Sequence, residues 1–356
     1  MDRKRTNLTG EGHDEPISAH LPKRSRTTHT DWDNGPRELQ TPTATRDQYT
    51  IAWICALSLE MAAARAMLDE IHEPLPRITG DSNAYTLGRI GQHNIVIACL
   101  PEGQYGTVNA ASVVVNAIRS FASTRAVLMV GIGGGVPSQA DIRLGDVVVG
   151  TRVMQYDLGK IVGAGQIQST GIWKQPHTPL STAVSSLRAK HDQSSSQIPV
   201  ILKERAYSRP EEPDQLFPST YDHISSTSSC VECDLSKLLP RSRRKTHDPQ
   251  IHYGAIASGN QVMRSAIQRD LLAQQLKVIC FEMEAAGLMG TDPPCLPIRG
   301  ICDYSDSHKN KAWQPYAAAA AAAYAKEFVM ELPVFTEDRP RVAHSPKPGK
   351  LSLTLV

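Results

Sequence analysis

The chain has 356 residues, 40% of them hydrophobic, and its 38 Lys and Arg nearly balance its 36 Asp and Glu, for a formal net charge of +2. A chain of this size can bury a full core, and so small a net charge gives no reason to expect general nucleic-acid binding. No membrane span is expected, because the apolar runs fall short of ~20 residues and residues 127–136 are interrupted by four glycines.

The cysteines indicate the redox state of the cellular compartment in which the protein is expected. Seven cysteines, an odd number, lie mostly in apolar runs, and no signal peptide precedes them. Unpaired cysteines are typical of reducing compartments. We therefore expect an intracellular, cytoplasmic protein. The basic clusters Arg3–Arg5 and Lys23–Arg26 are either a solvated tail or a split signal for import into the nucleus.

The two ends of the chain differ from its middle. Residues 1–48 are rich in Thr, Arg, Asp, His and Pro and lack helix or strand periodicity, which predicts a disordered, basic and polar tail. Residues 333–356 are predicted to form a second disordered tail. Residues 49–332 alternate strand-like and helix-like segments, which predicts a single α/β domain with a central mixed β-sheet flanked by helices.

Apolar periodicity assigns the elements of this domain. The expected strands are 49–56, 94–100, 126–130, 146–149, 276–281 and 296–302, and the expected helices are 59–71, 110–121 and 313–332. The last helix begins with Gln-Pro-Tyr and contains seven consecutive alanines, which predicts a smooth helix packed close to the sheet. Residues 157–249, rich in Ser, Gln, Pro and charged residues, are predicted to be a long insertion or lid.

Two motifs with a familiar spacing do not predict a cofactor. Gly131–Gly135 follows a strand, but residue 136 is Val where the dinucleotide-binding fingerprint requires glycine, and no helix starts at once. Cys230 and Cys233 form a single Cys-x-x-Cys motif, and a zinc site needs two more ligands, for which only Asp222 and His223 are candidates. We interpret these cysteines as loop thiols and expect neither a metal nor a redox cofactor.

Two acidic motifs each end an apolar run. Glu282 and Glu284 flank Met283 at the end of the first run, and Asp303 closes the second. Carboxylates at the carboxyl ends of neighbouring strands in an open α/β sheet point into the ligand crevice, where an anion can accept hydrogen bonds from adjacent hydroxyl groups. Methionine adds a soft apolar surface. The pattern favours a site for a nucleoside, whose ribose has two such hydroxyls.

These motifs also resemble a known family. Five further motifs accompany them in the same order: Cys55–Glu60, Gly106–Ala111, Met129–Val136, Leu144–Val149 and Ala257–Val262. From Tyr49 to Leu332 the chain resembles the nucleoside phosphorylase and nucleosidase superfamily, and within it the methylthioadenosine/S-adenosylhomocysteine nucleosidase branch. Gly300–Lys311 is most similar to fungal members, which often form the N-terminal domain of large immune-receptor-like proteins. The resemblance implies a homo-oligomer and a purine nucleoside or nucleotide as ligand.

The resemblance also implies a role for single residues. Asp303 would be the general acid at purine N7, and Glu60 would position and deprotonate water. Glu284 would hold the ribose 2′- and 3′-hydroxyls, and Met283 would pack beneath the ribose. Arg299 is expected to orient the acidic loop. The other implied substrate-binding residues are Ile132, Gly133, Gly134, Val262 with its neighbours Asn260 and Gln261, Glu282 and Ser305.

Water or phosphate as the attacking group distinguishes the two reactions of this superfamily. A carboxylate at Glu60 would repel phosphate, and the aliphatic Ile132 offers no hydrogen bond where phosphorylases commonly have Ser. The sequence therefore favours hydrolysis, with adenine as the expected base. A phosphate-dependent purine nucleoside phosphorylase and a nucleoside-sensing module without turnover remain the alternatives.

The residues around the acid differ from those of the bacterial branch. Cys302 replaces the Ser that precedes the acid there, and a thiol is the weaker hydrogen-bond partner. Lys309 and Lys311 follow the acid closely. They are either solvated loop residues or contacts for a 5′-phosphate, which would suit adenosine phosphates, including ATP.

Overall fold

The computed structural model describes residues 44–163, 167–224 and 229–335, which all lie within one compact unit of the chain. Both basic clusters and most of the two predicted tails lie outside these residues. Residues 44–48, assigned from sequence to the N-terminal tail, are described: Ala44 is buried, and Arg46–Gln48 forms a 3-10 turn (η1) with the Arg46 guanidinium over the Phe121 ring. The packed structure therefore includes residues before the predicted domain start at Tyr49.

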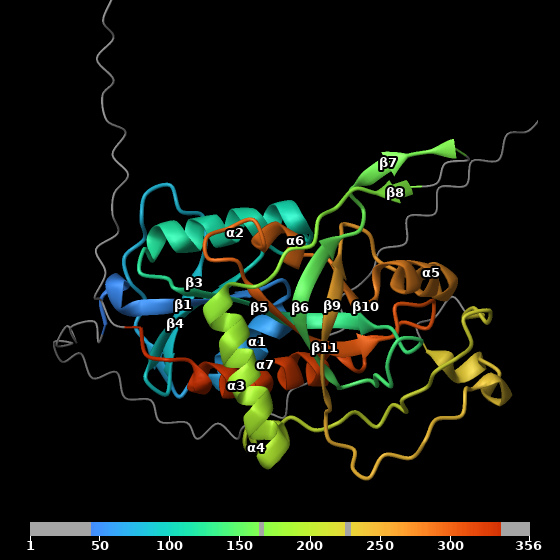
Figure 1. Ribbon diagram of the computed structural model, residues 1–356. Helices are drawn as coiled ribbons and strands as arrows, with labels where there is room; N and C mark the ends of the chain where they lie inside the picture. Colours follow the sequence, from blue (N-terminus) through green and yellow to red (C-terminus); the bar gives the residue numbers. More distant parts are fainter. Residues whose placement is uncertain (1–43, 164–166, 225–228, 336–356) are drawn as a thin grey trace, which may run out of the picture. The chain divides into compact units, whose positions relative to one another are not determined.

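A nine-stranded mixed sheet lies at the centre of the described chain (Figure 1), in the order β10-β9-β6-β11-β5-β1-β4-β3-β2. β5 runs parallel to β1 and β11, whereas β11 and β6 are antiparallel. The end of β5 also pairs with β10, so that β5, β11, β6, β9 and β10 close on themselves. The predicted mixed sheet is thus confirmed. Its strands are β1 (Tyr49–Cys55), β2 (Glu70–His72), β3 (Tyr85–Ile90), β4 (His93–Cys99), β5 (Ala126–Gly135), β6 (Val147–Gln155), β9 (Ile251–Ser258), β10 (Val278–Glu282) and β11 (Leu296–Asp303).

Helices cover both faces of the sheet (Figure 1). α1, α3 and α4 pack with α7 on one face, and α2 packs with α6 on the other. A small separate hairpin consists of β7 (Gly159–Ile161) and β8 (Ile167–Ser169). The helices are α1 (Ser58–Met67), α2 (Thr107–Ser120), α3 (Thr178–Gln193), α4 (Ile198–Glu204), α5 (Ala266–Leu276), α6 (Ala285–Leu288) and α7 (Gln314–Glu331), and the 3-10 turns in the insertion are η3 (Cys230–Glu232) and η4 (Leu235–Lys237).

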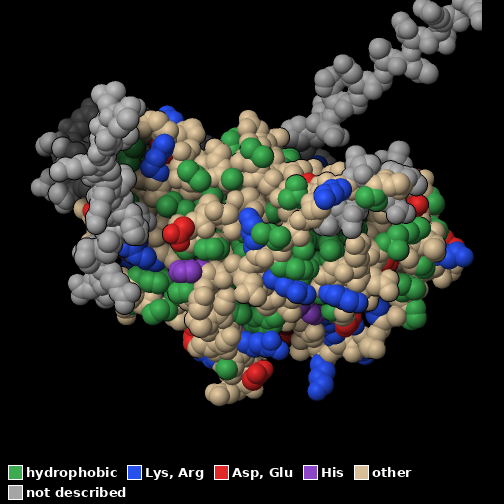
Figure 2. All heavy atoms as spheres, turned by 45° about the horizontal axis from the view of Figure 1, so that its top comes forward, with side chains coloured by type: hydrophobic (Ala, Val, Ile, Leu, Met, Phe, Trp, Pro, Cys, Tyr) green, Lys and Arg blue, Asp and Glu red, His purple; other side chains and the backbone are tan. Residues whose placement is uncertain are grey.

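The covered faces explain why the strands are apolar runs. Along β1, Ile51 and Trp53 pack into the core on the α1 and α7 side, while Ala52 and Ile54 pack into the core on the α2 side. Strands buried on both faces lose the alternation of polar and apolar residues. Among the described residues, no helix has the length and apolar character to cross a bilayer. Hydrophobic side chains on the face in Figure 2 are interspersed with charged ones.

Three element boundaries lie four or more residues from the sequence prediction. One is the end of β6, at Gln155 rather than Val149. Helix α1 ends at Met67 rather than Ile71, because residues 70–72 extend the edge of the sheet as β2, paired with β3. Strand β5 continues beyond the predicted end at Val130 to Gly135. The glycine segment predicted as a turn is therefore strand, since β11 on one side and β10 on the other provide its pairing partners.

The predicted alanine-rich helix is confirmed as α7, and its small side chains let it approach β11 closely. All seven alanines from Ala317 to Ala323 are at most 2% exposed. A Cβ atom at Gly300 of β11 would overlap the backbone carbonyl of Ala317. The helix and the strand thus meet at a distance that larger side chains would prevent.

Enlarging this interface should destabilise the fold. Ala320 is fully buried, so Ala320→Leu should lower the free energy of unfolding by about 1–3 kcal/mol, the usual cost of overpacking. Ala62→Leu at an exposed position of α1 is the matched control and should change it by less than about 0.5 kcal/mol. Urea unfolding curves measure both values. Equal effects of the two substitutions would show that α7 is not tightly packed.

Candidate active site

Polar side chains gather where β5, β10 and β11 end. Phe281 of β10 and Asp303 of β11 are both paired with Gly134 of β5. The double pairing of β5 therefore brings the two acidic motifs to opposite sides of one short segment of strand. Glu60, from the first turn of α1, reaches the same segment at Ile132.

Glu60 is a buried carboxylate held by backbone donors. Its side-chain Oε2 accepts hydrogen bonds from the backbone N–H groups of Ala56 (2.7 Å) and Leu57 (3.0 Å), and Oε1 accepts one from Ile132 (2.8 Å). The residue is 3% exposed. Burial raises the pKa of Glu60, while Arg299 and the three backbone donors oppose the rise. These donors hold the carboxylate in place, and its pKa lies above that of a solvated Glu.

Arg299 is fully buried among acidic groups. Its Nη2 atom forms ion pairs with Glu282 and, at 3.4 Å, with Oε2 of Glu284, and Nη1 lies 3.5 Å from the carbonyl oxygen of Ile132. Burial alone would lower the pKa of this guanidinium, but the surrounding carboxylates raise the pKa by more than burial lowers it, so Arg299 stays charged. Among the described residues, its hydrogen-bond and ion-pair partners are thus the two glutamates and Ile132, and a role of Arg299 in orienting the loop of Asp303 stays a prediction.

Glu282 and Glu284 have different surroundings. The carboxylate of Glu282 accepts hydrogen bonds from the backbone N–H groups of Glu284 (3.1 Å) and Ala285 (2.9 Å), so it supports the start of α6. Glu284 has one long backbone donor, Gly106 at 3.4 Å. Burial raises the pKa of Glu284 to about 7, helped by Glu282 and opposed by Arg299. Glu284 therefore keeps acceptor capacity for a ligand, whereas Glu282, predicted to bind substrate, is engaged inside the protein.

Asp303 lies in a tight turn with basic and polar neighbours. Its Oδ1 atom accepts a hydrogen bond from the backbone N–H of Ser305 (2.8 Å) and forms an ion pair with Nζ of Lys309 (2.9 Å). The Sγ atom of Cys302 lies 3.3 Å from Oδ2. Ser305 has a positive φ of 53°, and its buried Oγ has no hydrogen-bond partner among the described residues. Lys309, predicted as a phosphate contact, thus pairs with the candidate acid, and Lys311 is exposed.

Glycines make room for these side chains. A Cβ atom at Gly131 would collide with the Glu60 carboxylate and with Nη1 of Arg299, and one at Gly134 would lie 2.7 Å from Oδ1 of Asp303. Ile132, which donates to Glu60, and Gly134, which contacts Asp303, are two positions apart on β5, with Gly133 between them. At about 3.3 Å per residue this is roughly 7 Å along the strand.

The residues at the rim are less enclosed. Val262 is 57% exposed, and Met283 is partly buried. The Asn260 side chain accepts a hydrogen bond from the backbone N–H of Thr107 (3.0 Å) and donates one to Asp157 (2.9 Å), so it connects the start of α2 to the insertion. The structure therefore brings Glu60, Glu284 and Asp303 together around the β5 segment Ile132–Gly134, and leaves Val262 at its solvent side.

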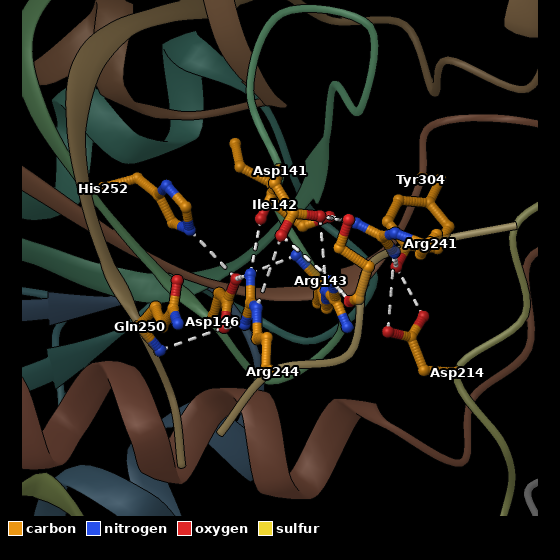
Figure 3. Close-up of polar contacts among 11 residues, drawn as sticks. Asp141, Ile142, Arg143, Asp146, Asp214, Arg241, Arg244, Gln250, His252 and Tyr304 are labelled. Carbon is orange, nitrogen blue, oxygen red and sulfur yellow. Dashed lines mark hydrogen bonds and ion pairs between the residues drawn. The ribbon is translucent and has the colours of Figure 1, made fainter. Parts of the chain in front are cut away.

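Side chains of the insertion anchor the turn that contains Asp303 (Figure 3). The hydroxyl of Tyr304 accepts a hydrogen bond from Nη1 of Arg241 (2.6 Å) and donates one to Asp214, and Arg241 and Asp214 form an ion pair at 3.6 Å. Nearby, Arg244 forms an ion pair of 2.7 Å with the buried Asp146. The sequence analysis missed these residues. Their one sequence signal is the short basic run Arg241-Ser-Arg-Arg244.

The charges of the site favour a cation. Three carboxylates, from Glu60, Glu282 and Glu284, surround the single Arg299 closely enough to shift its pKa. If all four groups are ionised, three negative charges of the carboxylates surround the one positive charge of Arg299. A fixed negative site of this kind stabilises positive charge that develops on a bound ligand.

Comparison with solved structures shows the same fold. A TM-score of 0.53 at 21% identity relates the chain to the 5′-methylthioadenosine/S-adenosylhomocysteine nucleosidase of Neisseria meningitidis in complex with methylthio-immucillin-A, with 80% of this chain and 99% of that chain covered. At this identity the likeness concerns the fold alone.

Sequence relatives are of two kinds. A nucleotide-binding leucine-rich repeat (NLR)-like protein of Hyaloscypha variabilis is 44% identical over 297 residues, which are 80% of this chain and 29% of the relative. A 5′-methylthioadenosine/S-adenosylhomocysteine nucleosidase of Mycobacterium bovis is 23% identical over 81% of this chain and 98% of its own length, and the ATP nucleosidase Cap17 of Escherichia coli is 24% identical over 78% of this chain and 50% of its own length. This chain therefore spans less than a third of the fungal relative.

The family itself follows from the extent of one match. The model of the Phosphorylase superfamily matches residues 50–329, which is most of the chain and includes every strand of the nine-stranded sheet except the first residue of β1. The chain belongs to the phosphorylase superfamily.

Proposed function

We propose that this protein hydrolyses the N-glycosidic bond of an adenine nucleoside or nucleotide and releases the free base. The observation that carries the proposal is the buried Glu60 carboxylate, which is bound by three backbone N–H groups, one of them two positions along β5 from the residue paired with Asp303. Two carboxyl groups that meet the same short segment of strand suit a base that activates water and an acid that protonates the leaving group. Relatives named as nucleosidases support the same reaction class.

Glu60 also supports water rather than phosphate as the attacking group. Backbone N–H groups that point into a cavity are the usual donors for a bound phosphate. Here Ala56, Leu57 and Ile132 already donate to an internal carboxylate. A phosphate ion entering this space would meet a negative charge instead of free donors.

The proposed reaction divides the work among three groups. Water gives a proton to Glu60 as its oxygen attacks C1′ of the ribose. The bond between C1′ and the base nitrogen breaks, its electron pair moves into the purine, and Asp303 protonates N7. Glu284 accepts hydrogen bonds from the ribose 2′- and 3′-hydroxyls and balances the positive charge of the oxocarbenium-like transition state. Met283 and Val262 would line the ribose and the base.

The ion pair between Asp303 and Lys309 favours a phosphorylated substrate. The ammonium group of Lys309 lies 2.9 Å from Oδ1 of Asp303, and a cation in this position is a ready partner for a phosphate group. A 5′-phosphate that attracts Lys309 would draw this cation away from the candidate acid. ATP is the proposed substrate on this ground, and the relative named as an ATP nucleosidase supports the choice.

Two alternatives make different predictions for the same experiment, in which products from ATP, adenosine and methylthioadenosine are separated by chromatography with and without phosphate. The proposal requires free base without phosphate. A phosphorylase would release base only with phosphate and form ribose 1-phosphate. A sensing module, which the NLR-like relative suggests, would bind a nucleotide and release no base.

Glu60→Gln should separate chemistry from binding. The amide keeps the side-chain size but is not a base, so kcat should fall by roughly two to four orders of magnitude, the usual worth of acid–base catalysis, while the dissociation constant for a non-hydrolysable nucleotide changes little. Glu102→Gln, an exposed residue, is the control. Thermal unfolding of both variants checks the fold. Unchanged turnover in Glu60→Gln would make Glu60 a structural helix residue.

The rate should depend on pH through Glu284. Burial raises the pKa of Glu284 to about 7, and the ionised form offers both oxygens as acceptors to the hydroxyls and a negative charge to the transition state. Below this pH the carboxyl is neutral, so kcat/KM should fall on the acid side by about tenfold per pH unit. The apparent pKa belongs to the whole carboxylate cluster around Arg299. A profile that falls only near the ordinary pKa of glutamate, 4.5, would contradict the assignment.

Lys309→Met should act on nucleotides alone. If Lys309 contacts the phosphate, its loss should raise KM for ATP by roughly 10- to 150-fold, the worth of a charged hydrogen bond of about 1.5–3 kcal/mol. KM for adenosine, which has no phosphate, should stay the same. Lys311→Met at the neighbouring exposed position is the control. Equal effects on ATP and adenosine would mean that Lys309 acts only through Asp303.

A further inference from the structure

The two cysteines of the insertion have a third partner. One potential ligand atom each from His223, Cys230 and Cys233 lie within 4.8 Å of one another. Both cysteines are buried and unpaired, and the turn η3 places them on one side, with the backbone N–H of Cys233 donating to the carbonyl of Cys230 at 3.0 Å. Asp222, the other candidate from sequence, instead accepts a hydrogen bond from Ser307 (3.1 Å). The turn thus has the form of a Cys-x-x-Cys metal knuckle with a nearby histidine.

His308 lies outside this group of mutually close ligand atoms but is the candidate for the fourth position. Its side chain is only 5% exposed, and its buried Nε2 atom has no hydrogen-bond partner among the described residues. Buried polar atoms in folded proteins are nearly always satisfied, so an unsatisfied one indicates a missing partner. His308 and Cys230 line the same small cavity, of about 20 Å³. The ring centroids of His308 and His223 are 5.5 Å apart.

The surroundings hold both histidine rings in place. His308 stacks on Phe217 with ring centroids 4.3 Å apart, and its Nδ1 lies 4.0 Å from a carboxylate oxygen of Asp306. The Nε2 atom of His223 lies 3.1 Å from the carbonyl oxygen of Ser229. A carboxylate or a carbonyl behind the second ring nitrogen is the usual arrangement around metal-bound histidine.

We propose that Cys230, Cys233, His223 and His308 bind a structural zinc ion. Two thiolates and two imidazoles form a complete tetrahedral set for zinc, with no position left for a reacting water molecule. Sulfur ligands also exclude magnesium and calcium, which prefer oxygen. The sequence alone predicted two loop thiols, because the fourth ligand is 75 residues from Cys233 along the chain.

Zinc at this position would connect the insertion to the loop of the candidate acid. His308 precedes Lys309, the ion-pair partner of Asp303, and the backbone N–H of His223 donates to the Ser307 side chain at 3.0 Å. The metal would therefore fix the loop from Asp303 to Lys309 against residues 221–224 and 229–233. The zinc site does not depend on the proposed hydrolysis and is tested without it.

Metal content and cobalt substitution of the full chain test the site. Protein purified without chelators should contain about one zinc ion per chain by plasma mass spectrometry, as a single four-ligand site requires. After the zinc is removed, added Co²⁺ should give the thiolate-to-cobalt charge-transfer band and the strong visible bands of tetrahedral cobalt. Both measurements use the wild-type chain, so they do not depend on the folding of a variant. A wild-type chain that contains no zinc and gives no cobalt spectrum, or that holds Cys230 and Cys233 as a disulfide, would overturn the proposal.

Variants assign the ligands. The double variant with Cys230→Ser and Cys233→Ser should lose the metal, whereas Cys99→Ser, a partly buried cysteine of β4, should keep it. His308→Asn should weaken zinc binding by more than about 100-fold, since even the loss of an outer-shell partner costs roughly 10–100-fold. His247→Asn, at an exposed position of the same insertion, is the matched control. Wild-type zinc affinity in His308→Asn would overturn the four-ligand site.

Discussion

The buried guanidinium of Arg299 is the group on which the candidate site depends. Glu282 and Glu284 pair with it directly, and the charge of Glu60 is partly balanced by it. Removing the cation from such a buried network would leave several carboxylates without a counter-charge, which costs about 3–5 kcal/mol for a single buried pair. The carboxylates would then take up protons, and the negative charge that a sugar cation needs would be lost. Arg299 therefore supports both the fold and the proposed chemistry.

Strand β5 separates the candidate ribose-binding carboxylate from the candidate acid, because the two lie at the ends of strands on opposite sides of it. Because β5 pairs with β10 and with β11, its last residues lie between the ribose-binding motif at Glu284 and the acid at Asp303. Glycine at positions 131 and 134 lets the carboxylates of Glu60 and Asp303 approach the strand backbone. The side chains of Tyr304, Arg241 and Asp214 then hold the acid turn from the outside.

Apolar runs and motif order were sufficient to predict the mixed sheet and the closing helix. Both faces of the sheet are covered, so each core strand stands out as an apolar run. Local patterns failed where distant partners decide the outcome. Gly131–Gly135 is strand because β10 and β11 pair with it. Glu282 faces inward because its carboxylate forms an ion pair with the buried guanidinium of Arg299. Lys309 pairs with Asp303 through a turn that periodicity does not reveal. Assembly as a homo-oligomer stays a prediction.

The rate of adenine release by wild-type protein, compared with Asp303→Asn in phosphate-free buffer, tests the central claim most directly. Asparagine keeps the size of the side chain and can still donate a hydrogen bond to N7, but it cannot transfer a proton. We expect release from ATP to fall by roughly two to four orders of magnitude while nucleotide binding persists, as loss of a general acid implies. Nucleotide binding by the wild-type protein with no base release above the Asp303→Asn background would contradict it.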